Sequence, residues 1–191
     1  IEDFTKLLLG LDYAEFLTDK EDEIEEFILS FIRERVAQRI ATITKRHDII
    51  DAVVNSNTSS VPEQLKAAKV LSAVSESEEF KGITEALNRV INISAKAKDD
   101  ASGEILEDRL ETESERNLVK AIQELNAKVG SLTPEELYSH LEAMAPKIND
   151  FFNENMVMVD DEATRRNRLR FLGLLSEIIL DLADFTSLIV K

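Results

Sequence analysis

The spacing of apolar residues constrains the fold of this chain more than any other feature of its sequence. Apolar side chains recur at steps of three and four residues along nearly the whole chain, as in the segment from Leu169 to Phe185. That spacing places them on one face of an α-helix. We therefore predict an all-α helical bundle of about six to nine helices, with no sheet beyond a stray strand pair at Met156–Val159.

Capping residues predict where several of these helices begin and end. Residues 133–136 read Thr-Pro-Glu-Glu, a capping box with proline at the first helical position. Pro146 should end or kink that helix at the preceding residue. The aspartate pair at 160–161 should cap the last helix. A charged helix or pair of helices is predicted over Glu104–Val129, with a break at Glu113–Arg116, where the apolar step is missing.

The apolar faces also predict the core. Methionine is a default filler of irregular gaps between helices, so we expect all three methionines to be buried. Within and beside the last helix the side chains expected to be buried are Phe152, Leu169, Leu172 and Ile179, and the methionines are Met144, Met156 and Met158.

A long helix is predicted from Glu21 to about Thr44, and its apolar stripe shifts part of the way along. Between Phe31 and Ile32 the stripe moves by roughly a third of a turn. Arg35 and Arg39 occupy the face that the first half of the stripe vacates. Either they extend over the edge of the core and pair with acidic residues, or they face an anionic partner.

Four arginines within six residues, 165–170, follow the expected start of the last helix. They do not serve the helix dipole, which favours cations at the other end. Asp161 and Glu162 lie within helical reach of Arg165. Arg168 has no acidic residue three or four positions away, so its partner must lie in another helix or outside the protein.

The net charge is −15, but charge is unevenly distributed. Acidic residues concentrate at Asp19–Glu26 and Glu104–Glu115, and cations at Phe27–Ile50 and Arg165–Phe171. A local basic patch on an acidic body and an acidity that only keeps the domain in solution are both compatible with this distribution.

The sequence offers little to catalysis. The chain has no cysteine, which excludes disulfides and thiolate metal sites. Its two histidines, His47 and His140, cannot build a multi-histidine metal site, and we interpret His47 as an ordinary exposed side chain. No glycine-rich phosphate loop and no signal peptide is visible, and no apolar run reaches the roughly eighteen residues of a membrane-spanning helix. The chain begins in mid-pattern, so we interpret residues 1–20 as the tail of a preceding helical region and 21–191 as the domain.

Several segments together resemble one family. Residues 151–169, FFNENMVMVDDEATRRNRL, are followed by an apolar helix and by ADFTSL at 183–188. NRVINI at 88–93 and the segment from Glu26 to Val53 agree with the same pattern. These stretches resemble the C-terminus of the beta subunit of bacterial glycyl-tRNA synthetase. The resemblance implies an all-helical anticodon-binding domain of the type shared with arginyl-tRNA synthetase.

The resemblance also implies a function. It suggests a domain that binds the anticodon of tRNA(Gly) and supports ATP-dependent glycylation, which is carried out at the alpha subunit. ATP and Mg would then be bound at the alpha subunit, with no cofactor in this chain. The implied partners are tRNA(Gly) and the alpha subunit in an alpha2beta2 assembly in the cytoplasm, with neither membrane nor DNA.

The candidate RNA contacts are polar residues near these motifs. Arginine and asparagine reach base edges in unstacked loops, and arginine also holds phosphates. With no tryptophan and two tyrosines, base reading would depend on hydrogen bonds more than on stacking. For Arg89, burial against a carboxylate beside Asn92 is an equally open interpretation. The alternative function is a non-enzymatic helical module that binds protein through an apolar groove. The candidate RNA contacts are Arg35, Arg39, Arg89, Arg165, Asn167 and Arg168.

Overall fold

The computed structural model describes residues 21–96 and 103–190, so the helix tail predicted for residues 1–20 lies outside the described part. Those ranges hold seven α-helices, three 3₁₀ turns and no strand, which confirms the all-α prediction, and no strand pair forms at 156–159. The helices are α3 (Glu21–Ile40), α4 (His47–Val54), α5 (Val61–Val74), α6 (Glu79–Ala95), α7 (Glu113–Asn126), α8 (Pro134–Glu154) and α9 (Glu162–Leu182). The 3₁₀ turns are η3 (Glu107–Arg109), η4 (Val129–Ser131) and η5 (Phe185–Ser187).

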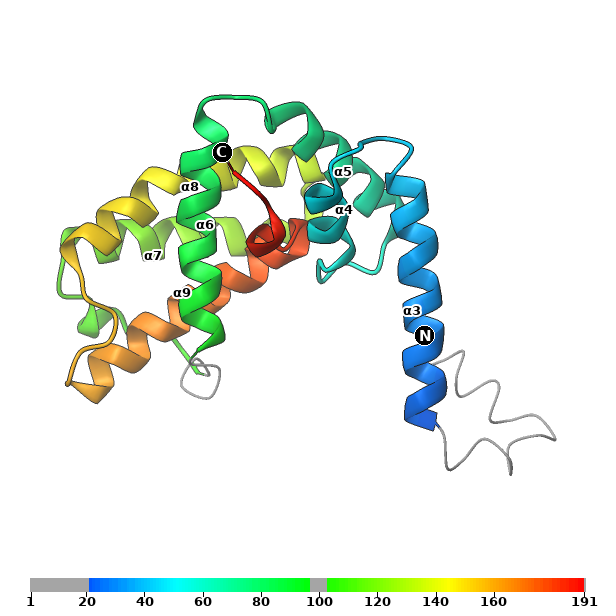
Figure 1. Ribbon diagram of the computed structural model, residues 1–191. Helices are drawn as coiled ribbons and strands as arrows, with labels where there is room; N and C mark the ends of the chain where they lie inside the picture. The colour runs from blue at the N-terminus through cyan, green and yellow to red at the C-terminus, as the bar shows by residue number, and fades with distance from the viewer. Residues whose placement is uncertain (1–20, 97–102, 191) are drawn as a thin grey trace.

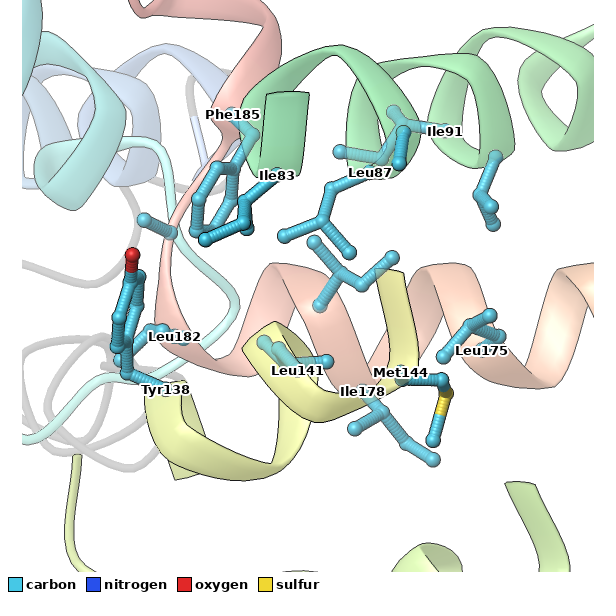
Figure 2. Close-up of a cluster of buried hydrophobic side chains, with 14 of the residues drawn as sticks. Ile83, Leu87, Ile91, Tyr138, Leu141, Met144, Leu175, Ile178, Leu182 and Phe185 are labelled. Atoms are coloured by element: carbon cyan, nitrogen blue, oxygen red, sulfur yellow. The ribbon is translucent and has the colours of Figure 1, made fainter. Parts of the chain in front are cut away.

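The core lies where α6 crosses α9 and both meet α8 (Figure 1). Figure 2 shows apolar side chains from these three helices and from Phe185 meeting in one cluster. Burial of such side chains contributes about 25 cal/mol per Å² of apolar surface removed from water. The predicted core residues Phe152, Leu169, Leu172 and Ile179 are all buried, as is Met144.

Helix α3 stands at the edge of the fold and packs on α4 and α5 (Figure 1). Val36 and Ile40 in its C-terminal half are buried, but Phe27 and Phe31 are 70% and 48% exposed. The first half of the predicted apolar stripe therefore faces solvent. The helix ends at Ile40 instead of continuing to Thr44, because the Ile40 carbonyl accepts the backbone N–H groups of both Ile43 (2.7 Å) and Thr44 (3.1 Å) in a tighter turn.

Capping boxes fix the starts of α7 and α8. The Thr133–Glu136 box forms as predicted. A second box, in which the Thr112 side chain and Glu115 bond each other's backbone, starts α7 at Glu113. The predicted break at Glu113–Arg116 is therefore wrong, because those residues form the first turn of α7. Residues before it carry only the short η3 turn.

Pro146 does not end α8, which continues to Glu154. A proline inside a helix removes one backbone hydrogen bond and normally terminates or bends the helix. Here Pro146 faces solvent, whereas Met144, Ile148 and Phe151 on the same helix are buried. Tertiary packing on both sides of the proline therefore holds the helix together.

The segment after α9 folds back onto the start of the domain. Main-chain bonds join Asp184 N–H to the Ala52 carbonyl and Asn57 N–H to the Leu180 carbonyl, each 2.8 Å. The Arg46–Asp48 ion pair then holds the backbone of Ile189: Arg46 Nη2 donates to its carbonyl (2.9 Å) and Asp48 Oδ2 accepts its N–H (2.9 Å).

Candidate nucleic-acid interface

The six candidate residues separate into two groups. Arg35 and Arg39 lie on α3, which packs on α4 and α5. Arg89, Arg165, Asn167 and Arg168 lie on α6 and on the first turns of α9, at the side of the molecule where α8 leads into α9 (Figure 1). We name this second region the α8–α9 junction; it comprises residues 104–115 and 152–170 together with Arg89.

Arg168 is 4% exposed and forms a buried ion pair with Glu115 of α7. Its Nη2 also donates to Glu111 Oε2 (2.9 Å) and its Nη1 to the Met156 carbonyl (2.8 Å). Glu115 Oε2 accepts the backbone N–H groups of Glu111 (2.7 Å) and Thr112 (3.0 Å), so the buried carboxylate is well supplied with donors. The partner of Arg168 is thus inside the protein, and its guanidinium is not available to RNA.

Asn167 is also committed to the fold. It is 1% exposed, and its Nδ2 donates to the Leu106 carbonyl (2.9 Å) while its Oδ1 accepts the Leu106 N–H (2.7 Å). The side-chain amide of Asn167 therefore satisfies both backbone groups of Leu106, as the backbone of a neighbouring β-strand would. Asn167 and Arg168 together hold residues 104–111 and the α8–α9 loop, residues 155–159, against α9.

Arg165 is half-buried, and its Nη1 donates to the Val159 carbonyl at 3.3 Å. It lies near Asp161, the N-cap of α9, whose side chain accepts the Thr164 N–H. The Thr164 backbone N–H and hydroxyl, with the charges of Arg109 and Arg165, hold the pKa of Asp161 below its ordinary value. The remaining guanidinium donors of Arg165 can reach an anion at the surface.

Arg89 is exposed, and its guanidinium carbon lies 4.1 Å from the centre of the Phe152 ring. This is a cation–π contact, in which the positive group rests on the negative face of the ring. The interpretation of Arg89 as a buried arginine tied to a carboxylate is wrong, and Asn92 is exposed as well. Stacking on Phe152 fixes the plane of the guanidinium and leaves its N–H edge to solvent.

On α3 both arginines are exposed. Arg35 rests over the Phe31 ring at 4.9 Å and donates from Nη1 to Gln38 Oε1 (3.1 Å). Within residues 21–96 and 103–190, neither Arg35 nor Arg39 forms an ion pair. Their positive charges are therefore solvated and open to a partner.

Met156 and Met158 are the surface residues that the sequence interpretation missed. They are 72% and 61% exposed, so the prediction that they fill the core is wrong. Between them Val157 is buried; the loop bends at Val157 and Met158, and the Val159 N–H donates to the Val157 carbonyl (3.1 Å). The alternation Met-Val-Met-Val was the signal for this arrangement.

The described part of the chain contains neither a metal cluster nor a membrane-spanning helix. Within the described ranges, no group of three His, Asp or Glu side chains is placed to hold a metal ion. His47 is exposed, as predicted. Among the same residues, no helix is both long and apolar enough to span a membrane.

Comparison with known proteins places the junction inside a recognised domain. Residues 83–184 match the DALR anticodon binding domain family. That range includes α6 from Ile83 onward, α7 to α9 and both segments that Asn167 and Arg168 hold, and it excludes α3.

The same chain is similar to glycine–tRNA ligase beta subunits. That of Lactobacillus acidophilus is 34% identical over 90% of this chain and 24% of the relative. That of Streptococcus pyogenes is 37% identical over 86% of this chain and 23% of the relative. The chain thus spans about a quarter of the length of these curated relatives. Since the family match covers more than half of its residues, the chain belongs to the DALR anticodon-binding domain family.

Proposed function

We propose that this chain is the tRNA-binding part of a glycine–tRNA ligase beta subunit and contacts the anticodon region of tRNA(Gly). The observation that carries the proposal is the placement of two outward-facing arginines, Arg89 and Arg165, inside the range that matches an anticodon-binding family. Arg35 and Arg39 on α3 form a second set of contacts with the RNA backbone. Arg168 and Asn167 serve the RNA indirectly, because they hold the loops beside it.

The acidity of the chain is compatible with this function, because several acidic residues at the junction already form ion pairs or a helix cap within the fold. Glu111 and Glu115 pair with Arg168, and Glu162 pairs with Arg166 at 2.6 Å. Asp161 accepts the Thr164 N–H as a helix cap. These contacts neutralise part of the acidic charge at the junction.

The relatives' names extend the proposal to the whole enzyme. In a glycine–tRNA ligase this chain would position tRNA(Gly) for an alpha subunit that binds ATP and Mg and joins glycine to the tRNA. The assembly would be alpha2beta2 and cytoplasmic. Neither DNA nor a membrane is a proposed partner.

A binding experiment on the 191-residue chain tests the proposal. A tRNA(Gly) transcript should bind more tightly than a transcript of another acceptor identity in a filter-binding titration. Arg89→Ala and Arg165→Ala should each weaken binding and lower the slope of log K against log salt by about one, because each removes one phosphate contact. Lys69→Ala, an exposed cation on α5, is the matched control and should leave the slope unchanged. Equal affinity for all transcripts would overturn the proposed specificity.

Protein binding through α3 is a second candidate function. Phe27, Phe31 and Ile32 on this helix are exposed by 70%, 48% and 38%. An apolar face of this kind marks a contact with another protein surface. The occupant we propose is another segment of the beta subunit, since the relatives are about four times as long as the matched part. Phe27→Ser with Ile32→Ser, which keeps the Phe31 ring under Arg35, should abolish binding of the chain to the remaining part of such a subunit, measured by calorimetry, and leave tRNA binding unchanged.

A further inference from the structure

We propose that the α8–α9 loop is a platform for an unpaired base of the bound RNA. In this arrangement Met156 and Met158 cover the face of the base, and Arg89 and Arg165 hold the flanking phosphates. The inference rests on the proposed tRNA binding and adds the surface that takes the base.

Exposure of the two methionines is the first observation. Nearly all large apolar side chains of the four helices in the matched range are buried, whereas Met156 and Met158 are 72% and 61% exposed. Leu106, which Asn167 holds against the same part of α9, is 40% exposed. Single exposed apolar residues are ordinary, but two on a five-residue loop around a buried Val157 form a small apolar surface.

The loop that carries these methionines is firmly held. Arg168 donates to the Met156 carbonyl (2.8 Å), Arg165 to the Val159 carbonyl (3.3 Å), and Asn155 Nδ2 to Ser114 Oγ (2.9 Å). A buried ion pair is expensive to desolvate, and this one is used to fix a loop whose side chains then point away from the core. A surface held in one conformation before binding loses little entropy when a partner arrives.

The charges beside the loop indicate what kind of partner fits. Phe152, under the Arg89 guanidinium, lies in the last turn of α8, four residues before Met156, and Arg165 bonds the Val159 carbonyl further along the loop. Among the described residues neither arginine forms an ion pair. An apolar surface between two available cations matches a nucleotide, which combines a flat base with an anionic phosphate. Methionine sulfur makes favourable contacts with aromatic rings, so it suits the face of a base.

The family match separates this loop from the apolar face of α3. Residues 155–159 lie inside the range that matches the anticodon-binding family, 83–184, whereas Phe27 and Phe31 lie outside it. Both surfaces combine exposed apolar side chains with arginines, but only the loop lies inside the matched range. We therefore place the unpaired base at the α8–α9 loop.

Methyl resonances test the platform directly, because the chain has only three methionines. In methyl-labelled protein, an RNA hairpin with the anticodon stem and loop of tRNA(Gly) should shift the Met156 and Met158 signals upfield through the ring current of the base. Met144, a buried residue of α8, is the internal control and should not move. A duplex made of the same stem without unpaired bases should produce no upfield shift.

A matched pair of double variants gives the second readout. Met156→Ser with Met158→Ser should weaken hairpin binding about tenfold, which lies within the range expected for losing the stacking on one base, and should leave the salt slope and melting temperature unchanged. Phe27→Ser with Ile32→Ser, which removes exposed apolar side chains of α3 and leaves the Phe31 ring under Arg35 in place, should leave hairpin affinity unchanged.

The outcomes separate the two proposals. No binding of the hairpin by the unmodified chain would contradict the proposed function itself. Hairpin binding with unshifted Met156 and Met158 signals and unchanged affinity of the methionine variant would overturn the platform and leave tRNA binding standing. Equal losses for hairpin and duplex with a lower salt slope would also overturn it, because they show a lost phosphate contact.

Discussion

Helix α3 and the α8–α9 junction contain the same kinds of residue and use them differently. Each carries arginines beside large apolar side chains, and each has an arginine resting on a phenylalanine ring. On α3 both the arginines and the phenylalanines face solvent. At the junction Arg168 and Phe152 are buried, while Arg89 and the two loop methionines remain exposed.

The difference teaches that counting cations does not locate a binding surface. At the junction acidic partners from α7 and from the segment before it take up Arg168, which therefore stabilises the fold. Arg89 and Arg165, at the same junction, form no ion pair within the described ranges. On α3 neither Arg35 nor Arg39 is buried or ion-paired among the described residues, and Arg35 contacts only its helical neighbours Phe31 and Gln38.

The largest expected effect comes from breaking the buried ion pair. Arg168→Ala leaves Glu115 charged and buried, so it should lower the free energy of unfolding by about 3–5 kcal/mol in a denaturant titration. Arg39→Ala on α3 is the matched control and should change it by less than about 0.5 kcal/mol. Replacing both partners, as in Arg168→Met with Glu115→Leu, should recover much of the loss. Similar losses for Arg168→Ala and Arg39→Ala would erase the distinction between the two regions.

Truncating one apolar side chain in the core and one on α3 tests the same contrast between the two regions. Leu172 is fully buried, so Leu172→Ala should lower the unfolding free energy by about 2–5 kcal/mol through lost transfer and a cavity. Phe27→Ala, which removes a larger but 70% exposed side chain, should change it by less than about 0.5 kcal/mol. Thermal or urea unfolding of the two variants side by side measures both. A large loss for Phe27→Ala would show that α3 packs more tightly than its exposure indicates.

Helix caps allow a finer test of the junction. Thr112 forms a complete capping box with Glu115, and Thr112→Ala should lower the unfolding free energy by about 1 kcal/mol. Ser60, the N-cap of α5, forms no side-chain capping bond, so Ser60→Ala should have almost no effect. Urea titrations of both variants are sensitive enough. Equal effects would indicate that the Thr112 bond adds nothing beyond its backbone conformation.

The smallest effect concerns the partly exposed ion pair near α3. Burial raises the pKa of Asp48, but the bonds from Arg46 and the Ile189 N–H outweigh it and hold the pKa below its ordinary value. A lowered folded-state pKa means that the stabilisation is present above the unfolded pKa and disappears as pH falls through the folded pKa. The Ile189 amide resonance should titrate in that acidic window, and Asp48→Asn should abolish the titration. A resonance that does not move with pH would show that Asp48 does not hold the segment.

Local sequence signals predicted most of the helices. The spacing of Leu169, Leu172 and Ile179 and the Thr133 box were sufficient, because periodicity and capping depend on neighbouring residues. Of the two outcomes predicted at Pro146, an end or a kink, the structure excludes an end at the preceding residue, because α8 continues to Glu154 with Ile148 and Phe151 buried. The capping box at Thr112 was present in the sequence but went unrecognised.

The site was harder to predict than the fold, because its partners are distant in sequence. Arg168 bonds Glu115, 53 residues away, and Asn167 bonds Leu106, 61 residues away. The sequence showed that Arg168, unlike Arg165, lacks an acidic residue three or four positions away, but it left open whether the partner lies in another helix or outside the protein. Only the tertiary arrangement shows that Arg168 supports the fold, whereas Arg165 bonds only the Val159 carbonyl.

Two main-chain hydrogen bonds, between Asp184 and Ala52 and between Asn57 and Leu180, limit how far the domain can be shortened. The range that matches the family starts at residue 83, yet the end of α9 and the residues after it lean on the α4 segment. A chain shortened to 83–184 would leave Leu182 and Ala183 uncovered and these backbone groups unpaired. We therefore expect the earlier helices to belong to the same cooperative unit. Because these bonds join residues far apart in the chain, forming them carries a large loop-closure entropy.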